Sequence, residues 1–196
     1  MTLGQEQIII DGELTNEIAR HKGRYHFVAF FCRPGMAVLD FPCGTGYGSK
    51  IIRSQGAYYF GHDISETAID YAKRNFAGTF HQADLTTWGS VENYFDLIAC
   101  IEGLEHIDKR SQKKLIPEFY KALKPGGKLI ISTPESTTGC SGPNPKNPFH
   151  KYELTYRDFT LLLDTLADWQ HVQSLEQDEV LDDGLEHSCF YAVCQK

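Results

Sequence analysis

Two short stretches of this sequence carry residue types that could do chemistry. The first is a glycine loop at residues 40–48 (DFPCGTGYG), which directly follows an apolar run. Glycines let the backbone approach a ligand closely, and N–H groups at the start of a following helix favour an anionic group. Asp40, at the mouth of this turn, would repel a pyrophosphate and favours a ligand with an ammonium or sulfonium charge. The G-x-G-x-x-G pattern of dinucleotide sites is also incomplete, because Ser49 stands where its last glycine belongs.

The second stretch is residues 101–107 (IEGLEHI), which places Glu102, Glu105 and His106 directly after another apolar run. Two carboxylates three residues apart, with an adjacent imidazole, can converge at the end of one strand. Such a mixture suits a divalent cation or a carboxylate–histidine general base. The alternative is purely structural, with Glu105 and His106 capping the next helix.

The elements that must position these residues follow from alternating apolar runs and amphipathic stretches. We expect strands at residues 37–41, 57–64, 79–83, 95–101 and 128–132, and helices at residues 16–31, 47–54, 65–75, 111–123 and 156–166. A turn at 124–127 ends the fourth helix, and the tail is predicted to be a hairpin of residues 169–175 and 188–194 with a long acidic connection. This order indicates an open α/β sheet, whose ligands bind beyond the carboxyl ends of the strands. Those ends carry Asp40, Asp63, Asp84, Glu102 and Thr133.

Length and composition indicate one ordinary globular domain. The chain has 196 residues, is 41% hydrophobic and 23% charged, and carries a formal net charge of −7. An acidic chain gains nothing from counterion release, so a nucleic-acid partner is not expected. No apolar run is long enough to span a bilayer and no signal peptide is evident, so we expect a cytoplasmic protein without membrane insertion. The six cysteines form no CxxC pair, and we expect reduced, mostly buried thiols.

Four stretches in order resemble the motifs of class I S-adenosylmethionine-dependent methyltransferases. They are residues 38–48 (VLDFPCGTGYG), Asp63 at the end of the second strand, residues 83–85 (ADL), and residues 123–131 (LKPGGKLII). The resemblance implies a Rossmann-like, seven-stranded, mostly parallel α/β sheet with helices on both faces and a C-terminal antiparallel hairpin. It also implies S-adenosyl-L-methionine as the cofactor.

The same resemblance implies which residues hold that methyl donor. Asp63 would accept the ribose hydroxyls and Asp84 the exocyclic amine of the adenine. The donor's carboxylate could lie on the glycine loop or on Arg24, which could equally be a solvated surface charge. The full set of expected cofactor-binding residues is Arg24, Asp40, Gly44, Gly46, Asp63, Ile64, Asp84, Leu85 and Ile101.

The E-x-x-E-H arrangement resembles three branches of that family. They are the quinone-biosynthesis O-methyltransferases, the metal-dependent methyltransferases of small-RNA 3′ ends, and bacterial enzymes of sugar and surface-glycan pathways. The form of residues 147–150 (NPFH) looks most like the sugar-directed group. We therefore predict O-methylation of a sugar, glycan precursor or other small molecule, with quinol or catechol rings second and RNA 3′ ends third. N-methylation remains open, and a protein that binds the methyl donor without catalysis is the alternative of another class.

We expect Glu102, Glu105, His106 and His150 to meet on the substrate side of the methyl donor. They would bind Mg²⁺ or Mn²⁺ and polarise a vicinal diol, or His106 or His150 would act directly as the base, with Glu105 in the catalytic group. The whole chain, 1–196, is predicted to be a single domain. Residues 1–35 form a helical lid and residues 134–155 a loop that covers the substrate. We expect the protein to be a monomer or a homodimer.

Overall fold

A single seven-stranded sheet runs through the protein, in the order β3-β2-β1-β4-β5-β7-β6. The computed structural model describes residues 16–89, 91–180 and 186–196, with backbone alone for residues 16–21, 178–180 and 186–187. The strands are β1 (Ala37–Asp40), β2 (Tyr58–Asp63), β3 (Thr79–Gln82), β4 (Phe95–Ile101), β5 (Leu123–Pro134), β6 (His171–Val180) and β7 (Glu186–Gln195). All neighbours pair in parallel except β7, which is antiparallel to both β5 and β6. The predicted fold is confirmed.

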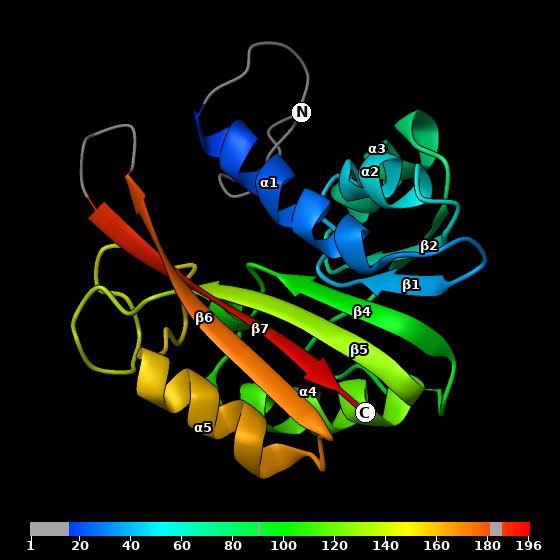
Figure 1. Ribbon diagram of the computed structural model, residues 1–196. Helices are drawn as coiled ribbons and strands as arrows, with labels where there is room; N and C mark the ends of the chain where they lie inside the picture. Colours follow the sequence, from blue (N-terminus) through cyan, green and yellow to red (C-terminus); the bar gives the residue numbers. More distant parts are fainter. Residues whose placement is uncertain (1–15, 90, 181–185) are drawn as a thin grey trace.

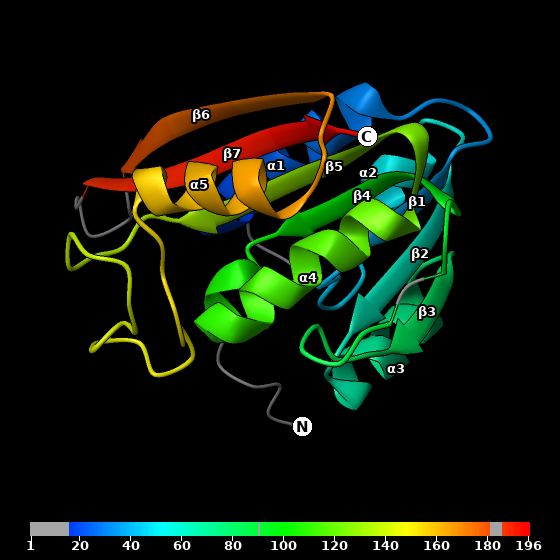
Figure 2. The same ribbon diagram turned by 90° about the horizontal axis from the view of Figure 1, so that it is seen from below.

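Helices cover both faces of this sheet. They are α1 (Asn16–Phe31), α2 (Gly48–Arg53), α3 (Glu66–Asn75), the 3₁₀ turn η1 (Leu104–His106), α4 (Lys109–Ala122) and α5 (Tyr156–Leu166). In Figure 1, α1, α2 and α3 lie on one side of the sheet, whereas α4 and α5 lie on the other. Figure 2, seen from below, shows α4 and α5 packed across that second face. Each face therefore buries an apolar core of its own.

Polar side chains begin three of the helices, as the physics of helix ends requires. Ser65 accepts a hydrogen bond from the Ala68 N–H at the start of α3, as predicted. Asp108 and Thr155 cap α4 and α5 in the same way. The caps follow β2, η1 and the loop after β5, so they fix where the chain leaves the edge formed by the carboxyl ends of the strands.

Two boundary predictions were wrong. The predicted turn at 124–127 belongs to β5, which starts at Leu123, directly after α4. Gly126 takes a positive φ of 78° there, and its N–H donates to the Lys196 carbonyl at 2.8 Å, so the C-terminus completes the strand's hydrogen bonding. The acidic stretch from Glu176 is strand too, because β6 continues to Val180 in pairing with β7. Only the connection 181–185 lies outside the described residues.

Two further sequence expectations concern helices and thiols. Among the described residues, no helix has the length and apolar character needed to cross a membrane. None of the six cysteines is in a disulfide, and five are buried while Cys140 is exposed. Of residues 1–35, which were predicted to form a lid, residues 1–15 lie outside the described residues, α1 spans residues 16–31 and a turn follows it.

The glycine loop packs tightly against α1. A Cβ on Gly48 would lie 2.2 Å from the ring of Tyr25, which is buried and also meets Tyr47 edge-on at 5.0 Å between ring centroids. Gly46 has a φ of 82°, and a Cβ there would lie 2.7 Å from the Ala72 Cβ. Glycine is therefore required at both positions, because side chains of α1 and α3 pack directly against the backbone of the loop.

We predict that Gly48→Ala destabilises the protein by about 1–3 kcal/mol, because the new methyl group must displace Tyr25 and with it α1. Urea unfolding followed by circular dichroism measures this change. The matched control is Gly23→Ala in α1, where an added Cβ meets nothing within 4 Å. That substitution should stabilise the helix by about 0.5–1 kcal/mol. Equal effects of the two substitutions would contradict the proposed packing constraint.

Candidate active site

Asp63, at the end of β2, joins the glycine loop to the start of α3. Its Oδ2 accepts a hydrogen bond from the Gly44 N–H at 2.8 Å, and its Oδ1 accepts from the Ser65 N–H at 2.9 Å. Burial raises the pKa of Asp63, while the hydrogen bonds from Ser65 and Gly44 oppose that rise. Each carboxylate oxygen can accept more than one hydrogen bond, so Asp63 retains acceptor capacity for a ligand hydroxyl.

The sequence predicted Asp40 at the mouth of the loop, but the structure buries it beneath the loop. Its exposed fraction is 0%, and its carboxylate accepts hydrogen bonds from the Tyr25 hydroxyl at 3.2 Å and the Tyr59 hydroxyl at 2.5 Å. Burial raises the pKa of Asp40 to about 7, although the two tyrosine hydrogen bonds lower it. Asp40 therefore supports the loop from beneath and ties α1 to β1 and β2, and in this conformation it offers no surface to a cation.

Arg24 and Glu102 link α1 to the end of β4. Arg24 is buried, and its Nη2 lies 3.7 Å from Oε2 of Glu102. The other oxygen of Glu102, Oε1, accepts hydrogen bonds from the Ser132 hydroxyl at 2.8 Å and from the Cys189 thiol at 3.3 Å. Arg24 is thus not a surface charge, and it reaches the end of β4, the strand that neighbours β1 and its glycine loop.

Three of the other predicted cofactor-binding residues lie on the β2 and β3 side of this edge. Ile64 follows Asp63 and exposes 62% of its surface, an unusual exposure for a large apolar side chain. Asp84 follows β3, and its Oδ1 accepts from the Thr86 N–H and the Thr86 hydroxyl, both at 2.8 Å. Leu85 is buried beside it. Ile101, the last residue of β4, is also buried, so only its backbone borders the edge.

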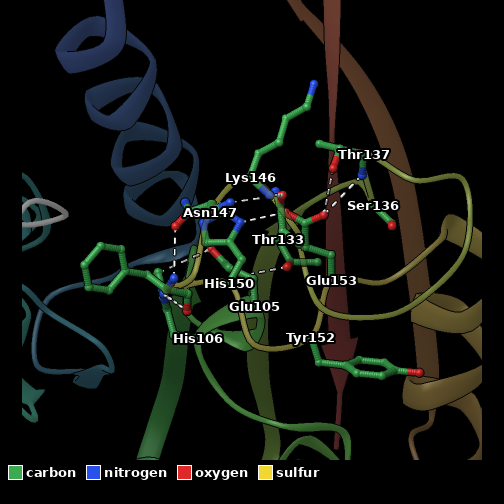
Figure 3. Close-up of polar contacts among 12 residues, drawn as sticks. Glu105, His106, Thr133, Ser136, Thr137, Lys146, Asn147, His150, Tyr152 and Glu153 are labelled. Atoms are coloured by element: carbon green, nitrogen blue, oxygen red, sulfur yellow. Dashed lines mark hydrogen bonds and ion pairs between the residues drawn. The ribbon is translucent and has the colours of Figure 1, made fainter.

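Glu105, His106 and His150 form a cluster that could hold a metal ion. One ligand atom from each residue lies within 4.8 Å of the other two (Figure 3). His106 Nε2 is 3.8 Å from Glu105 Oε1, and the two imidazole rings meet edge-on with centroids 5.2 Å apart. Burial, and then the nearby Glu102 carboxylate, raise the pKa of Glu105 well above its usual value, although the Thr133 hydroxyl donates to its Oε2 at 2.9 Å.

Glu102 was predicted to join this cluster, and the structure corrects that prediction. Glu102 has a φ of 49°, in the left-handed region, so the chain turns sharply between the two glutamates of the motif. Its carboxylate contacts Arg24, Ser132 and Cys189, whereas Glu105 faces His106 and Thr133. The structure therefore brings together three of the four predicted ligands.

Residues that the sequence did not single out hold the cluster in place. Gln112, from α4, donates through Nε2 to the Leu104 carbonyl at 2.8 Å and the Tyr152 carbonyl at 2.7 Å, so it joins η1 to the loop of residues 134–155. In Figure 1 this loop, in yellow, lies beyond the carboxyl end of β5. The His106 Nδ1 contacts the Phe149 carbonyl at 3.3 Å, and the His150 Nδ1 contacts Glu153 Oε1 at 2.7 Å.

The cluster also lies close to the glycine-loop side of the edge. Strand β4, which leads into η1, pairs in parallel with β1, which leads into the glycine loop, and a Cβ on Gly103 would lie 2.4 Å from the Cδ of Pro42 in that loop. One edge of the sheet thus combines a tight glycine loop, a carboxylate with acceptor capacity, and a group of two imidazoles and a carboxylate. That combination can bind a polyhydroxylated ligand and hold or remove a proton beside it.

We predict that Asp40 makes stability fall as pH rises. Because the pKa of Asp40 is about 7 in the folded protein and near 3.8 when unfolded, the folded state binds this proton more tightly. Its favourable contribution is complete below about pH 4 and is lost as pH rises through about 7. The free energy of unfolding of Asp40→Asn, relative to the native protein, should therefore increase between pH 5 and pH 8. A constant difference in urea unfolding at the two pH values would contradict this.

Comparison with known proteins agrees with this fold. The family described as "Methyltransferase domain" matches residues 38–127, from β1 into β5. A probable S-adenosylmethionine-dependent methyltransferase of Mycobacterium tuberculosis is 30% identical over 166 residues, which cover 83% of this chain and 60% of that protein. A ubiquinone biosynthesis O-methyltransferase of Coxiella burnetii is 35% identical over 104 residues, covering 50% of this chain and 44% of that protein. The chain thus matches no more than 60% of the length of either relative.

Solved structures show the same fold at lower identity. A SAM-dependent methyltransferase of Archaeoglobus fulgidus superposes with a TM-score of 0.74 at 17% identity, covering 93% of this chain and 95% of that one. Phosphoethanolamine N-methyltransferase 2 of Haemonchus contortus, solved with S-adenosyl-L-methionine, has a TM-score of 0.73 at 16% identity, covering 89% of this chain and 52% of that one. The match of residues 38–127 to the methyltransferase domain, the S-adenosylmethionine-dependent methyltransferases among the relatives and the seven-stranded fold confirm the predicted resemblance to class I S-adenosylmethionine-dependent methyltransferases.

Proposed function

We propose that this domain transfers a methyl group from S-adenosyl-L-methionine to a hydroxyl oxygen of a small molecule, with a sugar or glycan precursor as the first acceptor class. The observation that carries the proposal is the cluster of Glu105, His106 and His150, which directly follows the strand that pairs with β1 and its glycine loop. A protein that only binds the methyl donor has no need of two imidazoles and a buried carboxylate at this place. We therefore favour an enzyme over a binding protein.

On the methyl-donor side, each part of the ligand has a matching group. The ribose hydroxyls donate to Asp63, and charge-assisted hydrogen bonds of this kind are about twice as strong as neutral ones. Ile64 offers its exposed side chain to the adenine face, and Asp84 accepts from the adenine amine. The amino-acid part lies over Gly44 and the loop. Asp40 acts there indirectly, through Tyr25 and Tyr59.

On the acceptor side, the reaction needs alignment and removal of a proton. Methyl transfer is a displacement at carbon, and alignment of the two reactants can supply roughly 7–11 kcal/mol of the barrier. A hydroxyl acceptor must also lose its proton. His106 or His150 can take that proton directly, with Glu105 nearby, or the three residues can hold a divalent cation.

The donor set of this cluster bears on which cation would fit. One carboxylate and two imidazoles suit Mn²⁺ better than Mg²⁺, which prefers oxygen ligands and keeps several waters. When bound, such an ion would lower the pKa of a coordinated hydroxyl. The chain's own residues would still orient the acceptor and exclude water through the loop of residues 134–155.

A quinol or catechol ring is the second candidate acceptor. The 35% identity to the ubiquinone biosynthesis O-methyltransferase, over half of this chain, favours it. A catechol, like a sugar, presents two adjacent hydroxyl groups, so the same cluster could serve either. The acidic charge of the chain counts against the third candidate, an RNA 3′ end.

We predict that Asp63→Ala weakens binding of S-adenosyl-L-methionine about 10- to 100-fold, as expected for loss of charged hydrogen bonds worth about 1.5–3 kcal/mol. Isothermal titration calorimetry measures this change. The control is Asp70→Asn, an exposed position on α3 that should leave the dissociation constant unchanged. Native protein that takes up a pyridine dinucleotide and not S-adenosyl-L-methionine would refute the proposal.

We also predict that methyl transfer to vicinal diols depends on the cluster. His150→Ala and His106→Ala should each reduce turnover about 100-fold, and a chelator should do the same to the native protein, with recovery on adding Mn²⁺. The assay follows labelled methyl groups on a sugar diol, a catechol and an RNA 3′ end in parallel.

The control for this assay is His171→Ala, because His171 is an exposed histidine at the start of β6. It pairs with Gln195, which pairs with Lys128, at the opposite end of the β5–β7 ladder from the cluster contact Thr133. Turnover that survives chelation but not His150→Ala would favour direct base catalysis over a metal. Turnover unchanged in both histidine variants would remove the cluster from the reaction. The preferred acceptor in the panel decides between the first candidate and the second.

A further inference from the structure

Glu153 is a buried carboxylate outside both motifs that the sequence pointed to. It lies in the loop of residues 134–155, and only 1% of its surface is exposed. Its backbone is fixed by two hydrogen bonds to Gly142, one from the Gly142 N–H at 3.0 Å and one from the Glu153 N–H at 2.8 Å. The position of the carboxylate is therefore set by the loop itself and does not depend on solvent.

Three residues of the same loop donate hydrogen bonds to this carboxylate. Oε1 accepts from His150 Nδ1 at 2.7 Å and from Asn144 Nδ2 at 2.7 Å, while Oε2 accepts from the Thr137 N–H at 3.1 Å. A buried carboxylate needs such partners. Figure 3 shows that one of them, His150, stands between Glu153 and the Glu105–His106 pair.

The contact with Glu153 determines which ring nitrogen of His150 can do chemistry. A neutral imidazole carries one proton, and a carboxylate beside one nitrogen holds the proton there. Because Nδ1 lies 2.7 Å from Glu153 Oε1, Nδ1 is the donor. Binding of a metal ion, or acceptance of a proton from substrate, then falls to Nε2.

We propose that Glu153 is a positioning residue: it holds His150 in the Nδ1–H form and orients the ring so that Nε2 serves the cluster with Glu105 and His106. This inference rests on the proposed function, in which His150 is a metal ligand or a base. Histidines in both roles generally donate their second N–H to a carboxylate or carbonyl, which fixes ring orientation and raises basicity. The opposing explanation is that Glu153 only stabilises the loop.

The first test compares Glu153→Ala and Glu153→Gln with the native protein. Mn²⁺ affinity, measured by electron paramagnetic resonance of free Mn²⁺, should fall about 10- to 100-fold in Glu153→Ala. The loss should be smaller in Glu153→Gln, whose amide oxygen can still accept from Nδ1–H. In both variants kcat should fall while KM for S-adenosyl-L-methionine stays unchanged.

The matched control is Ser141→Ala. The Ser141 hydroxyl anchors the same loop by donating to Asp158 Oδ2 at 2.6 Å and accepting from the Thr155 N–H at 2.9 Å. We expect Ser141→Ala to lower the melting temperature but to leave Mn²⁺ affinity and kcat within about twofold. If Glu153→Ala and Glu153→Gln also change only the melting temperature, the positioning role is wrong.

A second measurement needs neither metal nor turnover. In ¹⁵N-labelled, metal-free protein, long-range ¹⁵N–¹H correlation reports the tautomer of each histidine. His150 should carry its proton on Nδ1 in the native protein and should lose that preference in Glu153→Ala. A native His150 protonated on Nε2 would overturn the inference. If the native protein binds no Mn²⁺, the metal part of the proposed function fails separately, and the tautomer and kcat still decide the role of Glu153.

Discussion

The burial of carboxylates at one edge of a parallel sheet is the constraint on which the site depends. Parallel pairing of β1, β2, β4 and β5 brings their carboxyl ends to one edge, and the chain places an acid at or near several of them. A buried carboxylate is costly unless donors surround it. Each of three buried acids has its own hydrogen-bond donors. Asp40 accepts from tyrosine hydroxyls, Asp63 from backbone N–H groups and Glu105 from a threonine hydroxyl.

Those donors come from elements far apart in the chain, so satisfying the acids also assembles the site. Tyr25 brings α1 onto the glycine loop, and Thr133 brings the end of β5 to η1. In the loop beyond β5, the hydrogen bond between Glu153 and His150 joins two parts of the loop in the same way. The polar network that makes the edge chemically useful is thus the network that holds its covering segments together. Substitution of one of these buried acids is therefore expected to disturb the chemistry and the local order together.

Sequence reasoning predicted the fold well because local signals agreed with one another. The period of apolar residues placed β4 and α5 at their observed bounds, and the cap at Ser65 was visible as a serine before an amphipathic stretch. The limits of β5 and β6 were missed because they depend on distant partners, which no local pattern reveals. The start of β5 pairs with β4 and Lys196, and β6 pairs with β7. For the site, residue types and strand ends indicated which acids gather at the edge. The direction of each side chain was beyond the sequence, as Asp40 illustrates, because it depends on Tyr25 and Tyr59 from other elements.

The turn at Glu102 explains why an E-x-x-E-H motif need not be a single ligand set. A non-glycine residue in the left-handed region costs on the order of 1 kcal/mol, and such strain is found where the surrounding structure over-determines it. Here the Glu102 N–H donates to the Ser132 carbonyl at 3.1 Å, and its carboxylate accepts from the Ser132 hydroxyl, so one residue of β5 holds both ends of the strained glutamate. The turn directs Glu102 toward Arg24 on α1 and leaves Glu105 to His106. One glutamate of the motif thus contacts the helix that covers the glycine loop and the other contacts the imidazole cluster, although only Gly103 and Leu104 separate them in the chain.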